Sequence, residues 1–234
     1  MTETADKARV IFRDLGTAEY KQVWDLQEGL FSAMIEEKQK CGAVTSDSHL
    51  LFVEHPHVYT LGKSGHENNL LINDAFLKSI DATYFKSNRG GDITYHGPGQ
   101  IVGYPIFDLE QMALQIKTYV HALEQAIINT LAQLGIQSER LDGATGVWLD
   151  VGTPGRARKI CAIGVKASRH VTMHGFALNV NTNLSYFNHI NACGFVDKGV
   201  TSIEKELGEK QDMEQIKSML LIQMSKVFNC TIVK

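Results

Sequence analysis

Apolar positions along the chain follow two spacings, one typical of helices and one typical of strands. Helical spacing extends over about residues 17–40, from Ile116 to a stop at Gly135, and over residues 213–228. Residues 74–80 are expected to form a short helix capped by Asn73. Apolar runs typical of strands cover residues 50–54, 58–61, 92–95, 101–107, 146–149, 160–167 and 175–180. We expect the strand at 101–107 to be irregular, because Gly103 and Pro105 interrupt it.

These strands do not alternate strictly with the helices, so the pattern predicts an α+β fold with a mixed or antiparallel sheet flanked by helices. The 234 residues suffice for one domain with a full core, and no repeat, low-complexity tract or linker divides them. A single domain over residues 1–234 is therefore expected. Hydrophobic residues make up 44% of the chain and charged residues 21%, as in ordinary globular proteins.

Charge and targeting signals narrow the classes of function. The formal net charge of −3 argues against a dedicated nucleic-acid-binding protein. No apolar run approaches the roughly 18–20 residues that cross a membrane, and the N-terminus lacks the features of a secretory signal. We therefore expect a cytoplasmic protein that binds neither nucleic acid nor membranes. Its four widely spaced cysteines contain no C-x-x-C pair and are expected to be free thiols.

The first segment with candidate chemistry is residues 89–100, which hold four glycines and a proline. Glycine is costly in backbone entropy, so bare backbone must be required there. One interpretation is a binding wall at which substrate lies against main-chain N–H groups; the other is an ordinary glycine-rich turn. The segment matches neither the P-loop nor G-x-G-x-x-G. A strand at residues 92–95 would present two side chains to the site and two to the core.

A basic run at residues 156–169 carries five lysines and arginines and no acid. It is either a solvated loop followed by a strand, or a docking patch for a negatively charged partner. Lys159 begins the apolar strand, where its ammonium would be partly desolvated. Further on, Cys193 stands before a glycine in a polar turn, whereas Cys161 lies inside the apolar strand and is expected in the core. A nearby cation stabilises a nucleophilic thiolate, and Lys159 would supply it if the fold brings the two together.

Two other chemistries were weighed against this one. His170 and His174, with Cys161 and Cys193, are residue types that zinc prefers, but they lack a C-x-x-C pair and fall on no clear helix. A Ser-His-Asp hydrolase is not supported, because no G-x-S-x-G motif is present.

Taken in order, these segments resemble the lipoate-biosynthesis octanoyltransferase family. The resemblance spans about residues 50–205 and is carried by residues 89–105, 146–148, 159–165, 174–180, 193–194 and 201–202. It implies a fold similar to the catalytic domain of biotin and lipoate ligases. It also implies an acyltransferase that moves an octanoyl or lipoyl group from acyl carrier protein to a lysine of a lipoyl domain. Acceptors would be the lipoyl domains of 2-oxoacid dehydrogenase complexes and the glycine cleavage H protein.

The resemblance assigns roles to residues as well. Cys193 would accept the acyl group as a thioester, and Lys159 would be its catalytic partner, with no ATP and no metal. The substrate wall would consist of Arg89, Gly90, Gly91, Asp92, Ile93, Thr94, Tyr95, His96, Ala162, Ile163, Gly164, Gly175, Phe176 and Ala177.

Two alternatives share parts of this pattern. An ATP-dependent lipoate–protein or biotin–protein ligase has the same fold and needs no cysteine nucleophile, but its glycine segment differs from the Tyr-His-Gly-Pro-Gly-Gln found here. A non-catalytic carrier-binding protein would be expected to have lost Cys193 or Lys159, and both are present.

Overall fold

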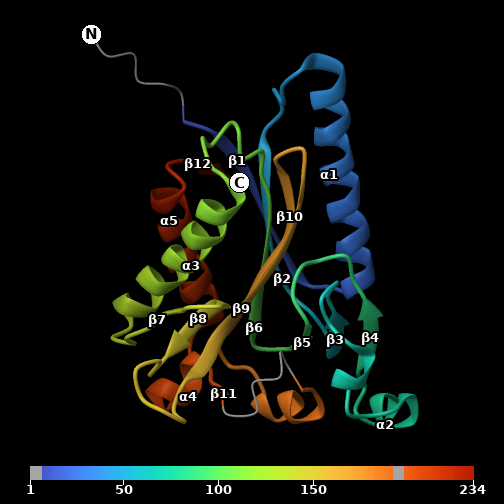
Figure 1. The fold of residues 1–234 in the computed structure, drawn as a ribbon. Coiled ribbons are helices and arrows are strands. Elements are labelled where there is room, and N and C mark those ends of the chain that lie inside the picture. The colour runs from blue at the N-terminus through green and yellow to red at the C-terminus, as the bar shows by residue number, and fades with distance from the viewer. Residues whose placement is uncertain (1–6, 192–197) are drawn as a thin grey trace.

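In the computed structural model of the chain, residues 7–191 and 198–234 are described, and they form a large mixed sheet between helices (Figure 1). The helices are α1 (Tyr20–Cys41), α2 (Asp74–Ser79), α3 (Ile116–Gln133), α4 (Ile203–Leu207) and α5 (Met213–Val227), with 3-10 turns at Glu67–Asn69 and Leu184–His189. The strands are β1 (Arg9–Thr17), β2 (Ser48–Glu54), β3 (Val58–Leu61), β4 (Thr83–Lys86), β5 (Ile93–His96), β6 (Gln100–Ile106), β7 (Glu139–Leu141), β8 (Ala144–Leu149), β9 (Arg158–Ser168), β10 (Val171–Asn179), β11 (Gly199–Val200) and β12 (Thr231–Val233).

Among the described residues the large sheet has nine strands, in the order β12-β1-β2-β6-β10-β9-β8-β7, with β11 paired to β9. Strand β1 is parallel to both its neighbours, whereas β2, β6, β10, β9, β8 and β7 are antiparallel in turn. A smaller sheet has the order β4-β3-β5. The predicted α+β class with a mixed sheet is confirmed. Within residues 7–191 and 198–234, no helix combines the length and the apolar composition needed to span a membrane.

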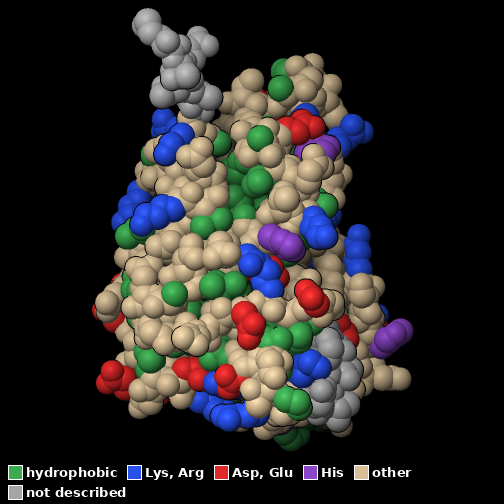
Figure 2. Space-filling view, turned by 60° about the vertical axis from the view of Figure 1, so that its left-hand side comes forward, with side chains coloured by type: hydrophobic (Ala, Val, Ile, Leu, Met, Phe, Trp, Pro, Cys, Tyr) green, Lys and Arg blue, Asp and Glu red, His purple; other side chains and the backbone are tan. Residues whose placement is uncertain are grey.

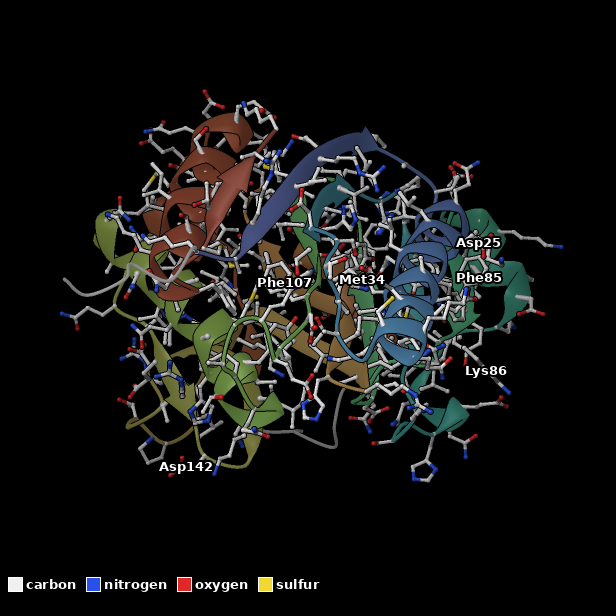
Figure 3. All side chains as sticks on the ribbon, turned by 90° about the horizontal axis from the view of Figure 1, so that it is seen from above. Asp25, Met34, Phe85, Lys86, Phe107 and Asp142 are labelled. Atoms are coloured by element: carbon white, nitrogen blue, oxygen red, sulfur yellow. The ribbon has the colours of Figure 1, made fainter. Side chains whose placement is uncertain are left out.

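Helices cover both faces of the large sheet because the side chains of its central strands alternate between two apolar cores. On β2, Leu50 and Phe52 join the core beneath α3 and α5, and Leu51 and Val53 join the core beneath α1. Figure 3 shows Met34 of α1 and Phe107 on opposite sides of the sheet. Strand β6 is buried along its whole length, as expected for a strand covered on both faces.

The prediction of an irregular strand at 101–107 was wrong. Strand β6 forms an unbroken antiparallel ladder with β2, in which Gly103 lies opposite Phe52 and Pro105 opposite Leu50. Its ladder with β10 covers Gln100 to Gly103 only. The missing N–H of Pro105 is therefore tolerated, because that residue lies beyond the β10 ladder.

Three buried histidines, His55, His96 and His174, lie close to Tyr20 and Trp24 of α1, and hydrogen bonds orient their rings. His55 donates from Nδ1 to the Ala18 carbonyl at 2.7 Å and accepts from the Tyr104 hydroxyl at Nε2. His174 donates from Nε2 to Asn88 Oδ1 at 2.6 Å. Burial lowers the pKa of His55 to about 4, and burial also lowers the pKa values of His96 and His174 to about 3. The fold therefore holds all three uncharged at neutral pH.

This burial predicts acid sensitivity of the fold. The unfolded chain protonates these histidines near pH 6.5, while the folded chain does so only near pH 3–4. Their contribution to stability is thus complete above about pH 6.5 and is lost as the pH falls toward 4, by up to about 1.4 kcal/mol per pH unit for each histidine. We expect His96→Gln to flatten the pH dependence of the free energy of unfolding, measured by guanidinium titration between pH 7 and 4.5. The exposed His66→Gln is the control, and an equal slope in both variants would contradict this reading.

Candidate active site

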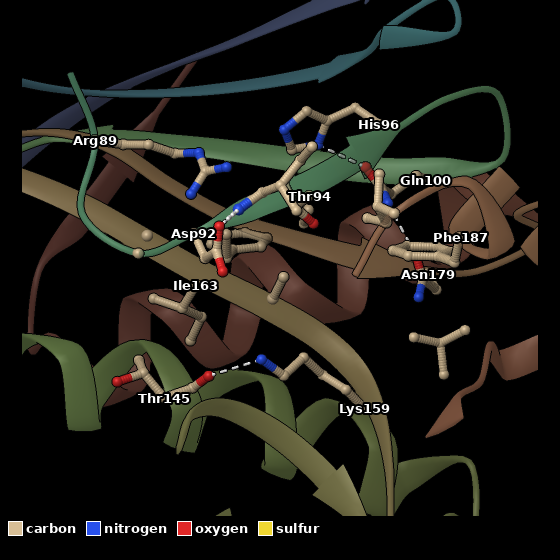
Figure 4. Close-up of a pocket in the computed structure, with 18 of the residues that line it drawn as sticks. Arg89, Asp92, Thr94, His96, Gln100, Thr145, Lys159, Ile163, Asn179 and Phe187 are labelled. Atoms are coloured by element: carbon tan, nitrogen blue, oxygen red, sulfur yellow. Dashed lines mark hydrogen bonds between the residues drawn. The ribbon is translucent and has the colours of Figure 1, made fainter. Parts of the chain in front are cut away.

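A cavity of about 680 Å³ opens where the small sheet faces β9 and β10 of the large sheet (Figure 4). Strand β5 and the glycine segment before it form one wall, and the central parts of β9 and β10 form the opposite wall. The rim is completed by residues 143–145, 187–191 and 198–200. The glycine segment and the strand that begins at Lys159, which sequence reasoning treated as separate centres, therefore meet in one site.

Twelve of the fourteen residues predicted for the substrate wall line this cavity. They are Arg89, Gly91, Asp92, Ile93, Thr94, His96, Ala162, Ile163, Gly164, Gly175, Phe176 and Ala177. Gly90 and Tyr95 are not among the lining residues. The Tyr95 side chain points to the other side of β5, where its hydroxyl is 2.7 Å from His57 Nδ1 and its ring stacks on Tyr186. Thr94 and His96 therefore face the cavity and Tyr95 faces the core, as alternation along a strand requires, while Ile93 contacts both.

The backbone of this segment packs closely against the backbone of neighbouring strands, at glycines on both sides of the contact. Gly90 donates its N–H to the Val165 carbonyl of β9 at 2.9 Å. A Cβ on Gly164 would lie 2.7 Å from the Gly90 carbonyl oxygen, and a Cβ on Gly62 would overlap the Gly91 carbonyl. Contact with substrate is one predicted reason for bare backbone here. The structure gives a second reason, because the turn is packed between β3 and β9.

Arg89 holds this turn in place. Its guanidinium donates from Nε to Thr60 Oγ1 at 3.2 Å, from Nη2 to the Thr60 carbonyl, and from Nη1 to the Gly90 carbonyl at 3.0 Å. The side chain is 8% exposed, so these charge-assisted bonds form with little competition from water. A large part of the arginine's donor capacity is used to fix the wall.

A chain of hydrogen bonds continues from Thr60 across the floor of the cavity. Gln100 donates to Asn179 Oδ1 at 2.8 Å, and this orientation leaves Gln100 Oε1 to accept from His96 Nδ1 at 2.9 Å. His96 Nε2 is then free to accept from Thr60 Oγ1, at 3.4 Å. At the other end, Asn179 donates to the Thr201 carbonyl at 2.9 Å. Hydrogen bonds therefore link His96 on the wall, through Gln100, to Asn179 (Figure 4). The bond from Asn179 to Thr201 extends this chain to the segment that follows residue 198.

Lys159 lies at the beginning of β9 and lines the same cavity. Its ammonium donates to the Thr145 carbonyl at 3.2 Å and lies 4.6 Å from the centroid of the Trp148 ring (Figure 4). A Cβ on Gly146 would lie 2.5 Å from the Cys161 carbonyl oxygen, so this glycine allows β8 to approach β9 beside the lysine. Carbonyl and aromatic ring both stabilise a cation.

Cys193, the predicted nucleophile, lies outside the described residues. The described residues on either side of that segment, Asn191 and Lys198, both line the cavity. Cys161 is fully buried in β9, and burial raises the pKa of its thiol, as expected for a cysteine of the core.

The histidines considered as zinc ligands have separate partners. His170 Nε2 lies 3.5 Å from Glu110 Oε1 at one end of the β9–β10 hairpin, and His174 contacts Asn88. Among the residues that the structure describes, no group of His, Cys, Asp and Glu has an arrangement suited to a metal ion.

The basic run at 156–169 does not form one patch. Arg158 pairs with Asp150 and with Glu206, the latter at 2.7 Å, and Lys166 approaches Glu28 at 3.4 Å. In the lower half of Figure 2 basic and acidic side chains lie beside one another. The interpretation of this run as a solvated loop and strand fits better than that of a docking patch.

Some lining residues had no sequence signal. Gln100 and Asn179 fall within the quoted motifs, but nothing in the pattern singled out Tyr20, Thr145 or Phe187. These three reach the cavity from elements that are distant in sequence, so only the folded chain brings them together.

Comparison with known proteins identifies the family of the chain. The family described as the lipoyl protein ligase A/B catalytic domain matches residues 19–225. The octanoyltransferase of Christiangramia forsetii is 54% identical over 221 residues, which are 92% of this chain and 94% of that protein. A bi-partite lipoate protein ligase from Thermoplasma acidophilum, described together with its E2 lipoyl domain, has a TM-score of 0.68 at 14% identity, covering 98% of this chain and 87% of its own. For the biotin protein ligase of Aquifex aeolicus these values are 0.50, 11%, 94% and 69%.

The predicted likeness to lipoate and biotin ligase domains is confirmed at the level of the fold. The chain belongs to the lipoyl protein ligase A/B catalytic domain family and, within it, to the octanoyltransferases.

Proposed function

We propose that residues 1–234 act as one catalytic domain that transfers an octanoyl group to a lysine of a lipoyl domain in protein lipoylation. The position of Lys159 carries this proposal, because Lys159 lines the same cavity as the glycine segment at residues 89–100. The sequence around that cavity belongs to a chain 54% identical to an octanoyltransferase. The donor would be octanoyl-acyl carrier protein, and the setting the cytoplasm.

The cavity suits an acyl chain of medium length. Its volume of about 680 Å³ lies in the range typical of small-molecule sites. Ile163, Phe176 and Phe187 supply apolar surface within it. Burial of the seven hydrocarbon groups of an octanoyl chain is worth about 5 kcal/mol, which is enough to anchor the acyl group during transfer.

The proposed reaction uses Cys193 as the nucleophile and Lys159 as its acid–base partner. The Cys193 thiolate attacks the carbonyl carbon of the octanoyl thioester, and the carrier leaves as a thiol after taking a proton from the Lys159 ammonium. The neutral amine of the target lysine then attacks the new thioester. Lys159 accepts the amine's proton, and the Cys193 thiolate is expelled as the amide forms. Both catalytic groups return to their starting states, and neither ATP nor a metal ion takes part.

Two classes of protein partner follow from this chemistry. The donor is an acyl carrier protein, and the acceptors are lipoyl domains of 2-oxoacid dehydrogenase complexes and the glycine cleavage H protein. The likeness to a lipoate ligase described with its E2 lipoyl domain supports a lipoyl-domain acceptor.

A ligase activity is the second candidate, because the similar solved structures include lipoate and biotin protein ligases. Such an enzyme would activate free octanoate or lipoate with ATP and would not need Cys193. Identity at these structures is only 11–14%, so they support the fold and not the reaction.

We expect an octanoyl thioester on Cys193 to form as an intermediate. Incubation with octanoyl-acyl carrier protein, without ATP, should add one octanoyl group to the intact protein, removable by hydroxylamine and absent in Cys193→Ser. Intact-protein mass spectrometry measures this directly. Transfer that requires ATP and free fatty acid, with no adduct on Cys193, would instead support the ligase.

Lys159 is expected to be needed both for octanoyl transfer and for the reactivity of Cys193. We expect Lys159→Ala to lower the rate of octanoyl transfer by at least about 100-fold and to raise the midpoint pH for alkylation of Cys193, because the nearby cation is lost. The measurement needs a Cys41→Ser background, since Cys41 is exposed while Cys161 and Cys230 are buried. Lys166→Ala is the matched control, because that lysine is on the same strand but contacts Glu28. An unchanged pH profile in Lys159→Ala would remove Lys159 from this role.

A further inference from the structure

Glu124 is a buried carboxylate on α3. It is 4% exposed, and both its oxygens are bonded. Oε1 accepts the N–H of Gly146 at 3.0 Å, and Oε2 accepts from Arg140 Nε at 2.9 Å. A buried charge of this kind is costly unless it is fully bonded, so its position calls for an explanation.

The N–H that Glu124 holds belongs to the same peptide group as the carbonyl that holds Lys159. The Thr145–Gly146 peptide donates its N–H to Glu124, and its carbonyl oxygen accepts from the Lys159 ammonium at 3.2 Å. In a planar trans peptide the N–H and the C=O point in opposite directions. The carboxylate that fixes one end of this peptide therefore also fixes the direction of the other.

The local backbone does not fix this peptide by itself. Gly146 has φ of +127°, a conformation open to glycine and strained for other residues. The pairing of β8 with β9 covers Val147 to Leu149, with a register shift between Val147 and Trp148. The Thr145–Gly146 peptide thus precedes the ladder with β9 and lies where the pairing of β8 with β7 shifts register, so the bond from Glu124 adds a constraint from outside the sheet.

We propose that Glu124 is a positioning residue for octanoyl transfer, which keeps the Thr145 carbonyl turned toward Lys159. The inference rests on the role proposed above for Lys159. An N–H bonded to a carboxylate also polarises its peptide, so the carbonyl becomes a stronger acceptor for the ammonium. Arg140, which also donates to the His121 carbonyl and to Gln125, holds the carboxylate in turn.

The test compares two variants of similar size. Glu124→Gln keeps an oxygen that can accept the Gly146 N–H, whereas Glu124→Met removes every acceptor. We expect Glu124→Met to lower kcat by about 10- to 100-fold, the range for small misplacements of a catalytic group, with KM for octanoyl-acyl carrier protein changed less than about threefold. Glu124→Gln should lose less than about fivefold. Thr130→Ala is the control, because its buried hydroxyl bonds only within α3, to the Ala126 carbonyl.

A double-mutant cycle separates positioning from general stability. If Glu124 acts through Lys159, Glu124→Met should change the residual rate of Lys159→Ala by less than about twofold. Equal losses in both backgrounds, or a Gln variant as slow as the Met variant, would overturn the proposal. Thermal unfolding of each variant is measured in parallel, and Glu124→Ala replaces Glu124→Met if the latter does not fold.

The two proposals fail in different ways. If Lys159→Ala retains full activity, the assignment of Lys159 fails, and the role of Glu124 with it. If Lys159→Ala is impaired and Glu124→Met is not, only the positioning role is wrong.

Discussion

The close contact between the glycine turn and β9 is the constraint on which the site depends. The bond from the Gly90 N–H to Val165 brings the small sheet against the large one, and side chains at Gly62 or Gly164 would prevent this approach. Arg89 then fixes the turn by bonding Thr60 and Gly90. Because the cavity is the space left between the two sheets, its shape follows from packing of backbone on backbone.

Much of the arrangement follows from short-range sequence patterns. The α5 helix and the β3 strand were predicted within one residue of their bounds and α1 within three, and Asn73 caps α2 by accepting from the Phe76 N–H. Alternation was expected for residues 92–95, but Tyr95, which was predicted for the substrate wall, points away from the cavity that Thr94 and His96 line. The predictions of these helices and this strand succeed because period and capping are properties of neighbouring residues, and tertiary contacts reinforce them.

Other features depend on contacts that no local pattern encodes. Strands β1, β4, β7 and β12 were not predicted; β4, β7 and β12 lie at the edges of their sheets, where pairing with one neighbour decides the structure of short or charged segments. The contact of Glu124 with Gly146 joins a helix to a strand 22 positions away, and a glutamate at that place in a helix looks like an ordinary surface residue. For Cys193 the sequence predicts a role as nucleophile, but this residue lies outside the described residues.

The basic run shows how the fold gives different roles to similar side chains. Arg158 and Lys166 form ion pairs with carboxylates. Their positive charges are therefore largely neutralised and attract a distant acidic partner only weakly. The contacts described for Lys159 are of another kind: a carbonyl oxygen and an aromatic ring, which hold an ammonium group without carrying a full negative charge. The Glu124 carboxylate, which is ion-paired with Arg140, accepts the Gly146 N–H and thereby fixes the peptide whose carbonyl contacts the Lys159 ammonium. A carboxylate can thus orient the surroundings of this lysine through a peptide group, because the N–H and the C=O of a planar peptide point in opposite directions.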